Sequence, residues 1–420
     1  MPALPCHDLA VGPISSCQLC ASGSLELVID LGHQPPCDSL LSAAQVSQPE
    51  RTFPLRLVRC TACGAAQIDY VVAAQELFYP SYPYRSGITP TLAANLRATA
   101  SGAVRRYGLG PKDLAVDIGS NDGTLLSGFQ ACGLRVLGVE PTDIARIAID
   151  AGIPTLQRFF DEETSREIRS SHGEVAIVTA ANMFAHVAQL GGLIRGVSGM
   201  LRDNGLFITE SHYLPSLLAT VQYDSIYHEH LKYYTVRDLI RLFGYHGFSV
   251  TEIEKIENYG GSVRVHARKG TGHPPGASVA ATLAEEDAMG LTGPAPFLAF
   301  AQQVRAARLA LQDFALRCRR EGRSLVGVGC PGRASTLVNY SALDRDLMPY
   351  IAEQSTSLKL GLHLPGTHQP VVDERVMLEQ QPDYALLLSW HYWQPIVRKL
   401  REKGLRSRIV IPLPELQIIE

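Results

Sequence analysis

Short apolar runs alternate with longer amphipathic stretches through the middle of the chain. The apolar runs cover 114–118, 135–139, 174–179 and 206–210, and each ends beside a glycine or a polar residue. Such runs are typical of strands buried on both faces of a parallel sheet, and the stretches between them have the length of helices. The alternation predicts an α/β domain with a doubly wound sheet, whose site lies at the carboxyl ends of the strands.

The pattern changes near residue 269. Residues 270–276 have the composition of a linker, and 280–321 show a helical pattern that breaks at 293–296. A strand over 324–328 then leads through a glycine-rich turn into another amphipathic stretch. This order predicts a second, Rossmann-like α/β domain at the C-terminal end.

Composition and charge narrow the class of protein. Apolar residues make up 46% of the 420 residues and charged residues 19%, which excludes a disordered chain. The net charge is −3 and no basic field is evident, so we expect no nucleic-acid partner. No apolar run reaches the ~18 residues of a membrane span, and the first eight residues lack the regions of a signal peptide. We therefore expect a cytoplasmic protein without a membrane partner.

Two cysteine pairs near the N-terminus have the spacing of metal knuckles. Cys17-Gln-Leu-Cys20 and Cys60-Thr-Ala-Cys63 are both C-x2-C turns, separated by residues 21–59. Two such turns complete a tetrahedral zinc site of four thiolates, and a closed site of this kind holds structure and does not catalyse. The alternative is four reduced, unliganded thiols. The pairs predict an N-terminal zinc-binding subdomain, and with the two α/β units they give expected domains at 1–80, 81–268 and 269–420.

The segment 77–86 interleaves tyrosines with prolines and therefore cannot form a regular helix. Two interpretations stay open. It is either a linker with packed tyrosines or a tyrosine-lined lid over a substrate pocket, with Tyr79, Tyr82 and Tyr84 as the candidates.

A glycine loop follows the first apolar run of the central domain. It reads Asp-x-Gly-x-Asn-Asp-Gly and lacks the G-x-G-x-x-G of a dinucleotide loop, and the next strand ends in an acid that can accept both hydroxyls of a ribose. The pattern resembles motif I of class I methyltransferases, which implies S-adenosylmethionine as the cofactor. A dehydrogenase loop and a plain sheet loop are the alternatives. The candidate cofactor residues are Asp117, Gly119, Asn121, Asp122, Gly123 and Glu140.

Three further polar residues follow later strands. Asn182 and His186 come after the run at 174–179, and Glu210 ends the run at 206–210. We expect all three at the binding edge of the sheet, Asn182 toward the cofactor and Glu210 toward the substrate. For each of them, an ordinary structural role is the alternative.

The run Tyr227-His228-Glu229-His230 places two imidazoles and a carboxylate just past a binding-edge strand. Histidine titrates near neutral pH and can act as a general base. In an extended segment His228 and His230 would point the same way, a geometry that suits a metal, although no third ligand is evident nearby. A general base, a metal site and structural histidines are the three interpretations.

The order of these motifs resembles one family along nearly the whole chain. The zinc pairs, the loop at 118–124, the Tyr-His-Glu-His run and Asn258-Tyr-Gly-Gly-Ser-Val-Arg264 are similar to the three-domain deoxysugar C-methyltransferases of antibiotic pathways. Those enzymes methylate C3 of a nucleotide-linked 4-keto-6-deoxysugar. The resemblance implies His230 as the base, with Tyr227, Glu229, His186 and one of the tyrosines, which we place at Tyr82, around the sugar. It also places Tyr79, Tyr84, Ser262 and Arg264 among the substrate-binding candidates.

In that family the C-terminal domain helps to hold the nucleotide-sugar. The resemblance therefore implies Gly329, Arg333 and Ser335, in the glycine-rich turn, as diphosphate contacts, whereas a plain strand–helix turn is the alternative. This chain departs from the family here: Arg333 stands for the usual lysine, His391 for an asparagine and Tyr259 for a histidine. We expect a nucleotide-sugar substrate, and a monomer or a weak oligomer.

Other functions remain open on the sequence alone. The same fold could methylate an oxygen, a nitrogen or another carbon of a related precursor, which needs no base for an α-proton. A nucleic-acid-binding methyltransferase and a redox enzyme that uses the second glycine loop are more distant alternatives.

Overall fold

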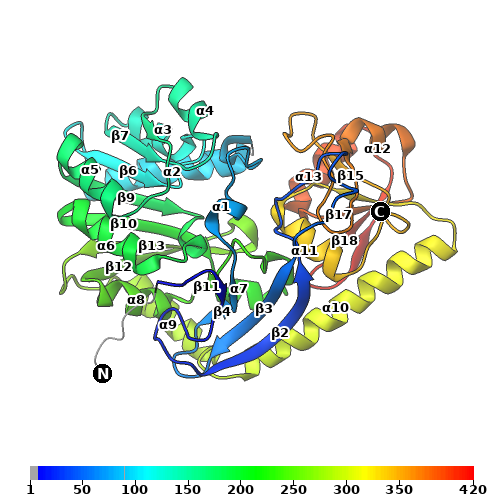
Figure 1. Ribbon diagram of the computed structural model, residues 1–420, viewed down its shortest axis with the longest axis horizontal. Coiled ribbons are helices and arrows are strands. Elements are labelled where there is room, and N and C mark those ends of the chain that lie inside the picture. The colour runs from blue at the N-terminus through cyan, green and yellow to red at the C-terminus, as the bar shows by residue number, and fades with distance from the viewer. Residues whose placement is uncertain (1–7, 89) are drawn as a thin grey trace.

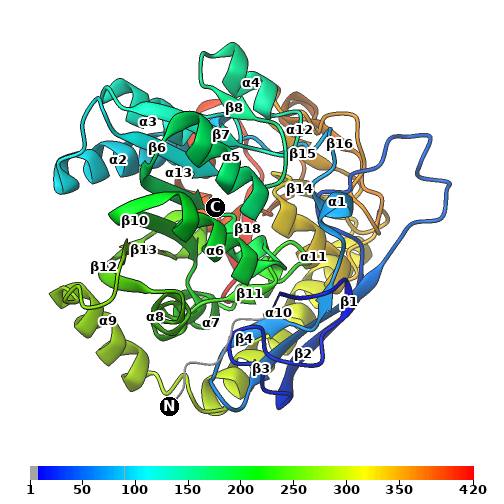
Figure 2. The same ribbon diagram turned by 60° about the vertical axis from the view of Figure 1, so that its left-hand side comes forward.

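The structure is a computed structural model that describes residues 8–88 and 90–420. The first seven residues of the expected zinc-binding domain thus lie outside the described residues. Three main sheets follow one another along the chain (Figure 1). The central seven-stranded sheet and the C-terminal six-stranded sheet form the two halves of the molecule, and the N-terminal sheet lies below and between them (Figures 1 and 2).

The N-terminal sheet is built from three strands of the zinc-binding segment and one distant strand. Its order is β11-β4-β3-β2, all antiparallel. β2 has both buried and exposed positions without a strict alternation, and its pairing with β3 shifts register twice. The strands are β2 (Leu25–Gln34), β3 (Phe53–Cys60), β4 (Ala66–Ile68) and β11 (Lys232–Tyr233), and a separate small pair joins β1 (Gly12–Pro13) to β5 (Tyr70–Val71).

The central sheet has the order β12-β13-β10-β9-β6-β7-β8. The strands β8, β7, β6, β9 and β10 are parallel, and β13 inserts antiparallel between β10 and β12. Asn204-Gly205 lies inside β10 at a shift in register. The strands are β6 (Leu114–Ile118), β7 (Arg135–Val139), β8 (Thr155–Leu156), β9 (Val175–Ala181), β10 (Leu201–His212), β12 (Phe248–Ile256) and β13 (Ser262–Lys269).

Helices cover both faces of this sheet. One apolar core packs α2 (Pro90–Tyr107), α3 (Thr124–Ala131) and α4 (Ala145–Asp150) against it, and the other packs α5 (Glu162–His172), α6 (Leu190–Met200) and α8 (Val236–Tyr245). Because both faces are buried, the strands are apolar along their whole length, which is why they stand out in the sequence. Two short helices, α1 (Ala74–Leu77) and α7 (Leu214–Ala219), lie between the sheets, and α9 (Ala277–Ala288) packs on β12.

The C-terminal sheet has the order β16-β15-β14-β17-β18-β19, in which only β19 is antiparallel. The long helix α10 (Ala295–Arg320) leads into it and runs beneath the N-terminal sheet (Figure 1). The other elements are β14 (Leu325–Val328), α11 (Gly332–Tyr340), β15 (Ile351–Glu353), β16 (Val371–Asp373), α12 (Glu374–Gln380), β17 (Tyr384–Leu387), α13 (Trp393–Glu402), β18 (Arg408–Ile411) and β19 (Gln417–Ile419).

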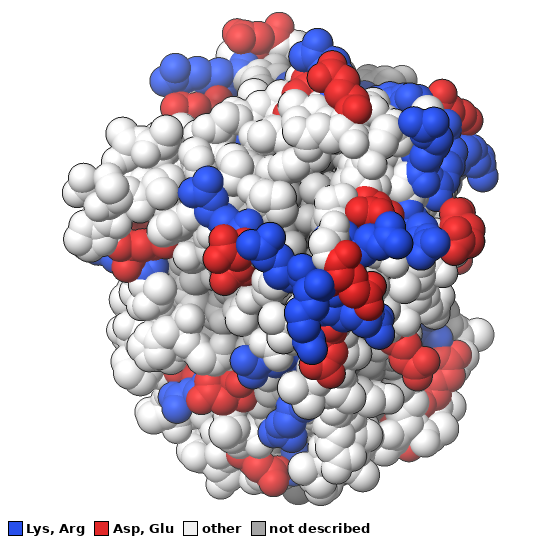
Figure 3. Space-filling model, turned by 90° about the vertical axis from the view of Figure 1, so that its right-hand side faces the viewer, with Lys and Arg blue, Asp and Glu red and all other residues white. Residues whose placement is uncertain are grey.

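One continuous core joins the N-terminal sheet, α7, α10, α11 and the C-terminal sheet. The N-terminal and C-terminal parts of the chain therefore pack together as one body, and the central sheet has its own cores beside it. On the face of the C-terminal half that Figure 3 shows, basic side chains lie beside acidic ones. Among the described residues, every helix is too short or too polar to cross a membrane.

Candidate functional site

A cavity of about 950 Å³ lies where the three main sheets meet. Its wall includes the glycine loop after β6, the segment before α2, the Tyr-His-Glu-His run and the start of α11. Twelve of the predicted site residues line it: Tyr82, Tyr84, Asp117, Gly119, Asn121, Glu140, Asn182, His186, Tyr227, Glu229, His230 and Arg333.

At one end of the cavity, the loop after β6 has a backbone that only a few residues can adopt. Gly119 has a φ of +70°, and a Cβ there would lie 3.0 Å from the Met183 side chain. Asn121 also has a positive φ, and its N–H donates to Glu140 Oε2 at 3.0 Å. The loop is thus held against the end of β7, with Gly119 open toward the cavity.

The carboxylates at this end have no cation beside them in the described part of the chain. Asp117 accepts a hydrogen bond from Thr179 Oγ1 at 2.5 Å, and Glu140 accepts from the Thr142 hydroxyl at 2.6 Å. Burial raises the pKa of Asp117 to about 7, and the Glu140 carboxylate contributes to this rise. A ligand that carries positive charge would stabilise the ionised carboxylates, and so offset both the cost of their burial and their mutual repulsion.

Two unpartnered polar atoms complete this end. Ser120 Oγ and Asn182 Oδ1 are buried without a hydrogen-bond partner among the described residues, and both residues line the cavity. A buried polar atom of this kind is normally satisfied by a ligand or by water. Acceptors beside two carboxylates suit the ammonium and the ribose hydroxyls of S-adenosylmethionine, so the residues present fit this cofactor.

At the other end, His230 has a defined tautomer. Its Nδ1–H donates to the Ser225 carbonyl oxygen at 2.9 Å, because a carbonyl can only accept. Nε2 therefore carries the lone pair and can receive a proton. Burial lowers the pKa of His230 to about 3, and the nearby Arg333 guanidinium lowers it as well. The imidazole is thus neutral, and its charged form becomes favourable only where negative charge develops beside it.

Aromatic rings enclose His230 on several sides. The ring centroids of Tyr227, His212 and His186 lie 4.0, 4.6 and 5.0 Å from its own. Burial also lowers the pKa of His186 and of His212 well below the usual range. A neutral, partly apolar surrounding of this kind keeps water away from the base and strengthens electrostatic contacts inside the cavity.

His228 lies away from this cluster. Its Nε2 is 3.2 Å from the Pro54 carbonyl oxygen and its ring packs on Phe53. Residues 228–229 form a turn, so the two imidazoles of the run do not point the same way. In the described residues no group of potential metal ligands contains either of them, and the structure does not favour a metal here.

Glu229 lies on the side of the cavity that faces the zinc-binding segment. It accepts hydrogen bonds from the Tyr82 hydroxyl at 2.9 Å and from Cys37 Sγ at 3.3 Å. Burial raises the pKa of Glu229 to about 8, and the Asp38 carboxylate contributes to this rise.

The three candidate tyrosines have different positions. Tyr82 and Tyr84 line the cavity, and the Tyr84 hydroxyl is 2.6 Å from that of Tyr259. Tyr79 does not line it, and its hydroxyl donates to the Asp38 carbonyl oxygen at 2.7 Å. The end of the segment is also held to the glycine loop, since Ser86 N–H donates to Asn121 Oδ1 at 2.8 Å.

Seven other predicted residues also lie outside the wall of the cavity: Asp122, Gly123, Glu210, Ser262, Arg264, Gly329 and Ser335. Asp122 caps the turn before α3, where it accepts from the Thr124 hydroxyl at 2.6 Å. Arg264 and Glu210 form a buried ion pair with 2.7 Å between Nη2 and Oε2. Their contacts are structural, so a role in binding has no geometric support for these residues.

Arg333 is the one predicted residue of the C-terminal domain that reaches the cavity. It is buried, with Nη1 3.6 Å from Asp224 Oδ2, and its Nη2 donates to the Tyr259 carbonyl oxygen at 3.0 Å. Its charge acts on His212, His230 and His391. Arg333 therefore lies close to the histidine end of the cavity.

Sequence reasoning missed several residues of the wall as site residues. His212 follows Glu210 by two positions at the end of β10, which is the signal that could have identified it. Tyr259 and His391 drew notice only as departures from the family pattern, and both line the cavity. Asp38 also lines it, and nothing in its local sequence marks it.

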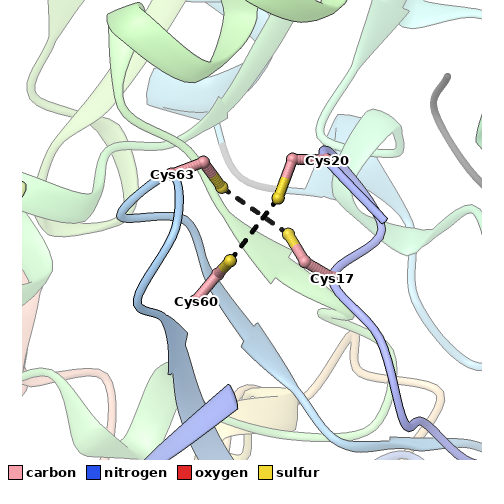
Figure 4. A group of neighbouring side chains, drawn as sticks. All are labelled: Cys17, Cys20, Cys60 and Cys63. Carbon is pink, nitrogen blue, oxygen red and sulfur yellow. Dashed lines mark hydrogen bonds between the residues drawn. The ribbon is translucent and has the colours of Figure 1, made fainter. Parts of the chain in front are cut away.

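The four knuckle cysteines come together at the end of the N-terminal sheet (Figure 4). Cys17 Sγ is 3.7 Å from Cys63 Sγ, and Cys20 Sγ is 3.5 Å from Cys60 Sγ. With Zn–S bonds of ~2.3 Å, the sulfurs of a tetrahedral site lie about 3.8 Å apart. Burial raises the pKa of the Cys20 thiol to about 12, so a cation is needed to hold the thiolates. The donor set fits a structural zinc ion.

The zinc knuckle is physically connected to the segment that carries His230. Cys60 ends β3, β4 follows the second knuckle, and β4 pairs with β11, in register Gln67 to Lys232. Ile68 N–H also donates to the Leu231 carbonyl oxygen at 3.0 Å, one residue after His230. The zinc site therefore helps to place His230.

The strand order with its inserted antiparallel strand, the open glycine loop and the acid after β7 define a class I methyltransferase that uses S-adenosylmethionine. The predicted α/β fold and both predicted cofactors, S-adenosylmethionine and zinc, are confirmed. The match to a methyltransferase domain covers residues 93–253, and the match to a zinc-binding domain covers 17–78.

The chain belongs to the family of zinc-containing C-methyltransferases. Residues 257–414 match the C-methyltransferase C-terminal domain. The chain is 31% identical over 414 residues to the C-methyltransferase NovU of Streptomyces niveus, which covers 97% of this chain and 98% of that protein. It is therefore an S-adenosylmethionine-dependent C-methyltransferase, as the sequence predicts.

Solved methyltransferases match the central part of the chain only distantly. Magnesium protoporphyrin IX methyltransferase (ChlM) from Synechocystis PCC 6803, solved with bound SAH, is 15% identical with a TM-score of 0.33, over 42% of this chain and 83% of that one. A SAM-dependent methyltransferase from Anabaena variabilis is 17% identical with a TM-score of 0.33, over 42% and 86%.

Proposed function

We propose that this C-methyltransferase acts on C3 of a nucleotide-linked 4-keto-6-deoxysugar, of the kind used in antibiotic pathways. The observation that carries the proposal is His230, a neutral imidazole with Nε2 free to accept a proton, in the same cavity as the cofactor residues. A carbon nucleophile is formed by removing a proton beside a ketone, and this step requires a base. Methylation at oxygen or nitrogen would not require the removal of a C3 proton.

The chain's own residues would divide the work as follows. His230 Nε2 removes the C3 proton, and the resulting negative charge spreads onto O4. Tyr82, Glu229 and His186 lie around His230 as candidate contacts to the sugar. The negative charge of the enolate stabilises the imidazolium that forms at His230 in this buried site, because the two charges appear together.

At the cofactor end, Asp117, Asn121, Glu140 and Asn182 would hold S-adenosylmethionine, which supplies an electrophilic methyl group when bound. Our proposal is that these residues orient it toward the histidine end and exclude water, since methyl transfer needs mainly positioning. Two carboxylates without a cation partner support this assignment.

We also propose that the nucleotide lies toward the C-terminal domain, where Arg333 lines the cavity. Gly329 and Ser335, which do not line it, remain predictions as diphosphate contacts. The bounds 1–80, 81–268 and 269–420 are our proposed domain limits, and the cytoplasm is our proposed location.

The test is turnover with S-adenosylmethionine and a panel of nucleotide-linked sugars, followed by mass spectrometry of the products. The panel pairs each 4-keto-6-deoxysugar with the matched sugar reduced to an alcohol at C4. We expect a methylated product only from ketosugars. Methylation of the reduced sugars would contradict the enolate route, because an alcohol at C4 leaves C3 without an acidic proton.

A further inference from the structure

Three segments that are far apart in the sequence meet in one buried charged cluster beside the cavity. Asp38, Glu229 and Lys359 are 4%, 3% and 6% exposed. Lys359 Nζ lies 2.5 Å from Asp38 Oδ1 and donates to the Cys330 carbonyl oxygen at 2.8 Å. The zinc-binding segment, the Tyr-His-Glu-His run and the C-terminal domain thus each contribute one ionisable residue.

Glu229 contacts only neutral donors in this cluster. Its hydrogen bonds come from the Tyr82 hydroxyl and the Cys37 thiol, and in the part of the chain that the structure describes no lysine, arginine or histidine forms an ion pair with it. Ligand atoms of Cys37, Asp38 and Glu229 all lie within 4.8 Å of one another. The cluster therefore contains two buried carboxyl groups and one ammonium group, that of Lys359, which contacts Asp38.

Charge balance decides which carboxyl group is ionised. Two like charges this close in a buried site cannot both persist, so one group keeps its proton. Lys359 stabilises the ionised form of Asp38 by direct contact, and that leaves Glu229 as the neutral group. The raised pKa of Glu229, about 8, agrees with this assignment.

We propose that Glu229 meets the substrate as a neutral carboxylic acid, and that the Asp38–Lys359 ion pair is the device that keeps it neutral. The substrate contact rests on the proposed function. A neutral acid can donate a hydrogen bond to the oxygen that gains charge in the enolate, whereas a carboxylate would repel it. Glu229 is then a catalytic residue, and Asp38 and Lys359 are positioning residues that act through it.

The other groups that face Glu229 do not titrate near neutrality. Burial raises the pKa of Tyr79, Tyr82, Tyr227 and the Cys37 thiol, so all four stay neutral. Behind Lys359 lie Cys330, whose pKa burial raises to about 12, and Glu353, which accepts from the Cys330 N–H at 2.7 Å. His230, the next residue along the chain, is neutral at any pH above its pKa of about 3.

The test is infrared difference spectroscopy of the full-length zinc-loaded protein without substrate, wild type against Glu229→Gln. The difference spectrum isolates the carbonyl stretch of one neutral carboxylic acid that only the first protein contains, because the band of Asp117, whose pKa burial raises to about 7, is common to both proteins and cancels. We expect this band to disappear on raising the pH, with a midpoint of about 8. Because no substrate is present, a protein that shows the titration but methylates no ketosugar would overturn only the proposed function.

Two substitutions give shifts of opposite sign. Asp38→Asn leaves Lys359 unneutralised and lowers the midpoint, whereas Lys359→Met leaves the Asp38 carboxylate unneutralised and raises it, each by about 1–3 pH units. The matched control is Lys403→Met, which breaks the Lys403–Glu374 pair on the C-terminal domain and leaves the midpoint unchanged. A Glu229 that is already ionised in the wild type well below pH 7, or two shifts of the same sign, would overturn the proposal. If Lys359→Met fails to fold, the wild type and Asp38→Asn still decide.

Turnover gives a second readout. The alkaline limb of kcat/KM, which reports the free enzyme as the infrared titration does, follows the infrared midpoint in the wild type and moves to lower pH in Asp38→Asn. Glu229→Gln keeps an N–H donor at the same place, so it loses this limb and retains more turnover than Glu229→Ala. A limb that stays in Glu229→Gln would show that another group titrates.

Discussion

The two ends of the cavity are built in different ways. The cofactor end comes from one stretch of sequence: the loop after β6, the acid after β7 and Asn182 after β9 all lie at the carboxyl edge of one sheet. The substrate end is assembled from three domains, with Asp38 from the first, His230 from the second and Arg333 from the third. The first end depends on local geometry, and the second depends on how the domains pack.

This difference explains how one methyltransferase sheet can serve different acceptors. The glycine loop is formed mainly by its own strand, turn and helix, so its geometry depends little on the other domains. His230 and its neighbours are held from outside the sheet, by the zinc-binding segment through β11 and by the C-terminal domain through the pair of Arg333 with Asp224. Damage at the two ends should therefore have separable effects.

The largest expected effect is loss of the base. His230→Ala removes the proton acceptor, and we expect kcat to fall by about 10²–10⁴-fold. Cofactor affinity, measured by calorimetry, should stay near the wild-type value because His230 is at the other end of the cavity. His228→Asn is the matched control, since that imidazole packs on Phe53, and near-normal kcat in His230→Ala would exclude it as the base.

Removal of zinc should come next. Chelation, or Cys60→Ser, releases the knuckle that supports β3 and β4, and with it the pairing to β11. A displacement of the base of ~1 Å can cost about 100-fold in rate, so we expect a fall in kcat of that order. Cofactor affinity should change little. A parallel loss of cofactor binding would show that the two ends are not independent.

Glu140→Gln should show the opposite pattern. The change removes charge from the group expected to accept the ribose hydroxyls, and a hydrogen bond to a charged group is worth about 1.5–3 kcal/mol. We therefore expect the dissociation constant for S-adenosylmethionine to rise at least about tenfold, with kcat at saturating cofactor nearly unchanged. A large drop in kcat at saturating cofactor would show that a change at the cofactor end also disturbs the histidine end.

The smallest expected effect concerns the tyrosines. Tyr84→Phe removes a hydroxyl that lines the cavity beside Tyr259, and a lost neutral hydrogen bond costs ~1 kcal/mol, or about fivefold in the KM for the sugar. Tyr79→Phe is the control, because that hydroxyl binds a backbone carbonyl away from the cavity. Equal effects of both changes would indicate that the segment acts as a structural linker.

The contrast between the two ends of the cavity also explains how much of the site could be predicted from the sequence. The glycine loop, Glu140 and the cysteine pairs are short patterns whose spacing implies their geometry, and the structure brings each set together. Arg264 and Glu210 show the limit, since each lies near the right edge but pairs with the other. Asp38 and Lys359 are hundreds of residues apart, and only the packing of the domains places them beside Glu229.

The most direct measurement is hydrogen exchange into the ketosugar in deuterated water, with S-adenosylhomocysteine present so that no methyl group can be transferred. C3 and C5 both flank the ketone, so C5 serves as an internal control. We predict enzyme-dependent deuterium at C3, lost in His230→Ala, with no His230-dependent exchange at C5. Exchange at C3 that persists in His230→Ala would contradict the account. So would methylation of a ketosugar that shows no enzyme-dependent exchange at C3.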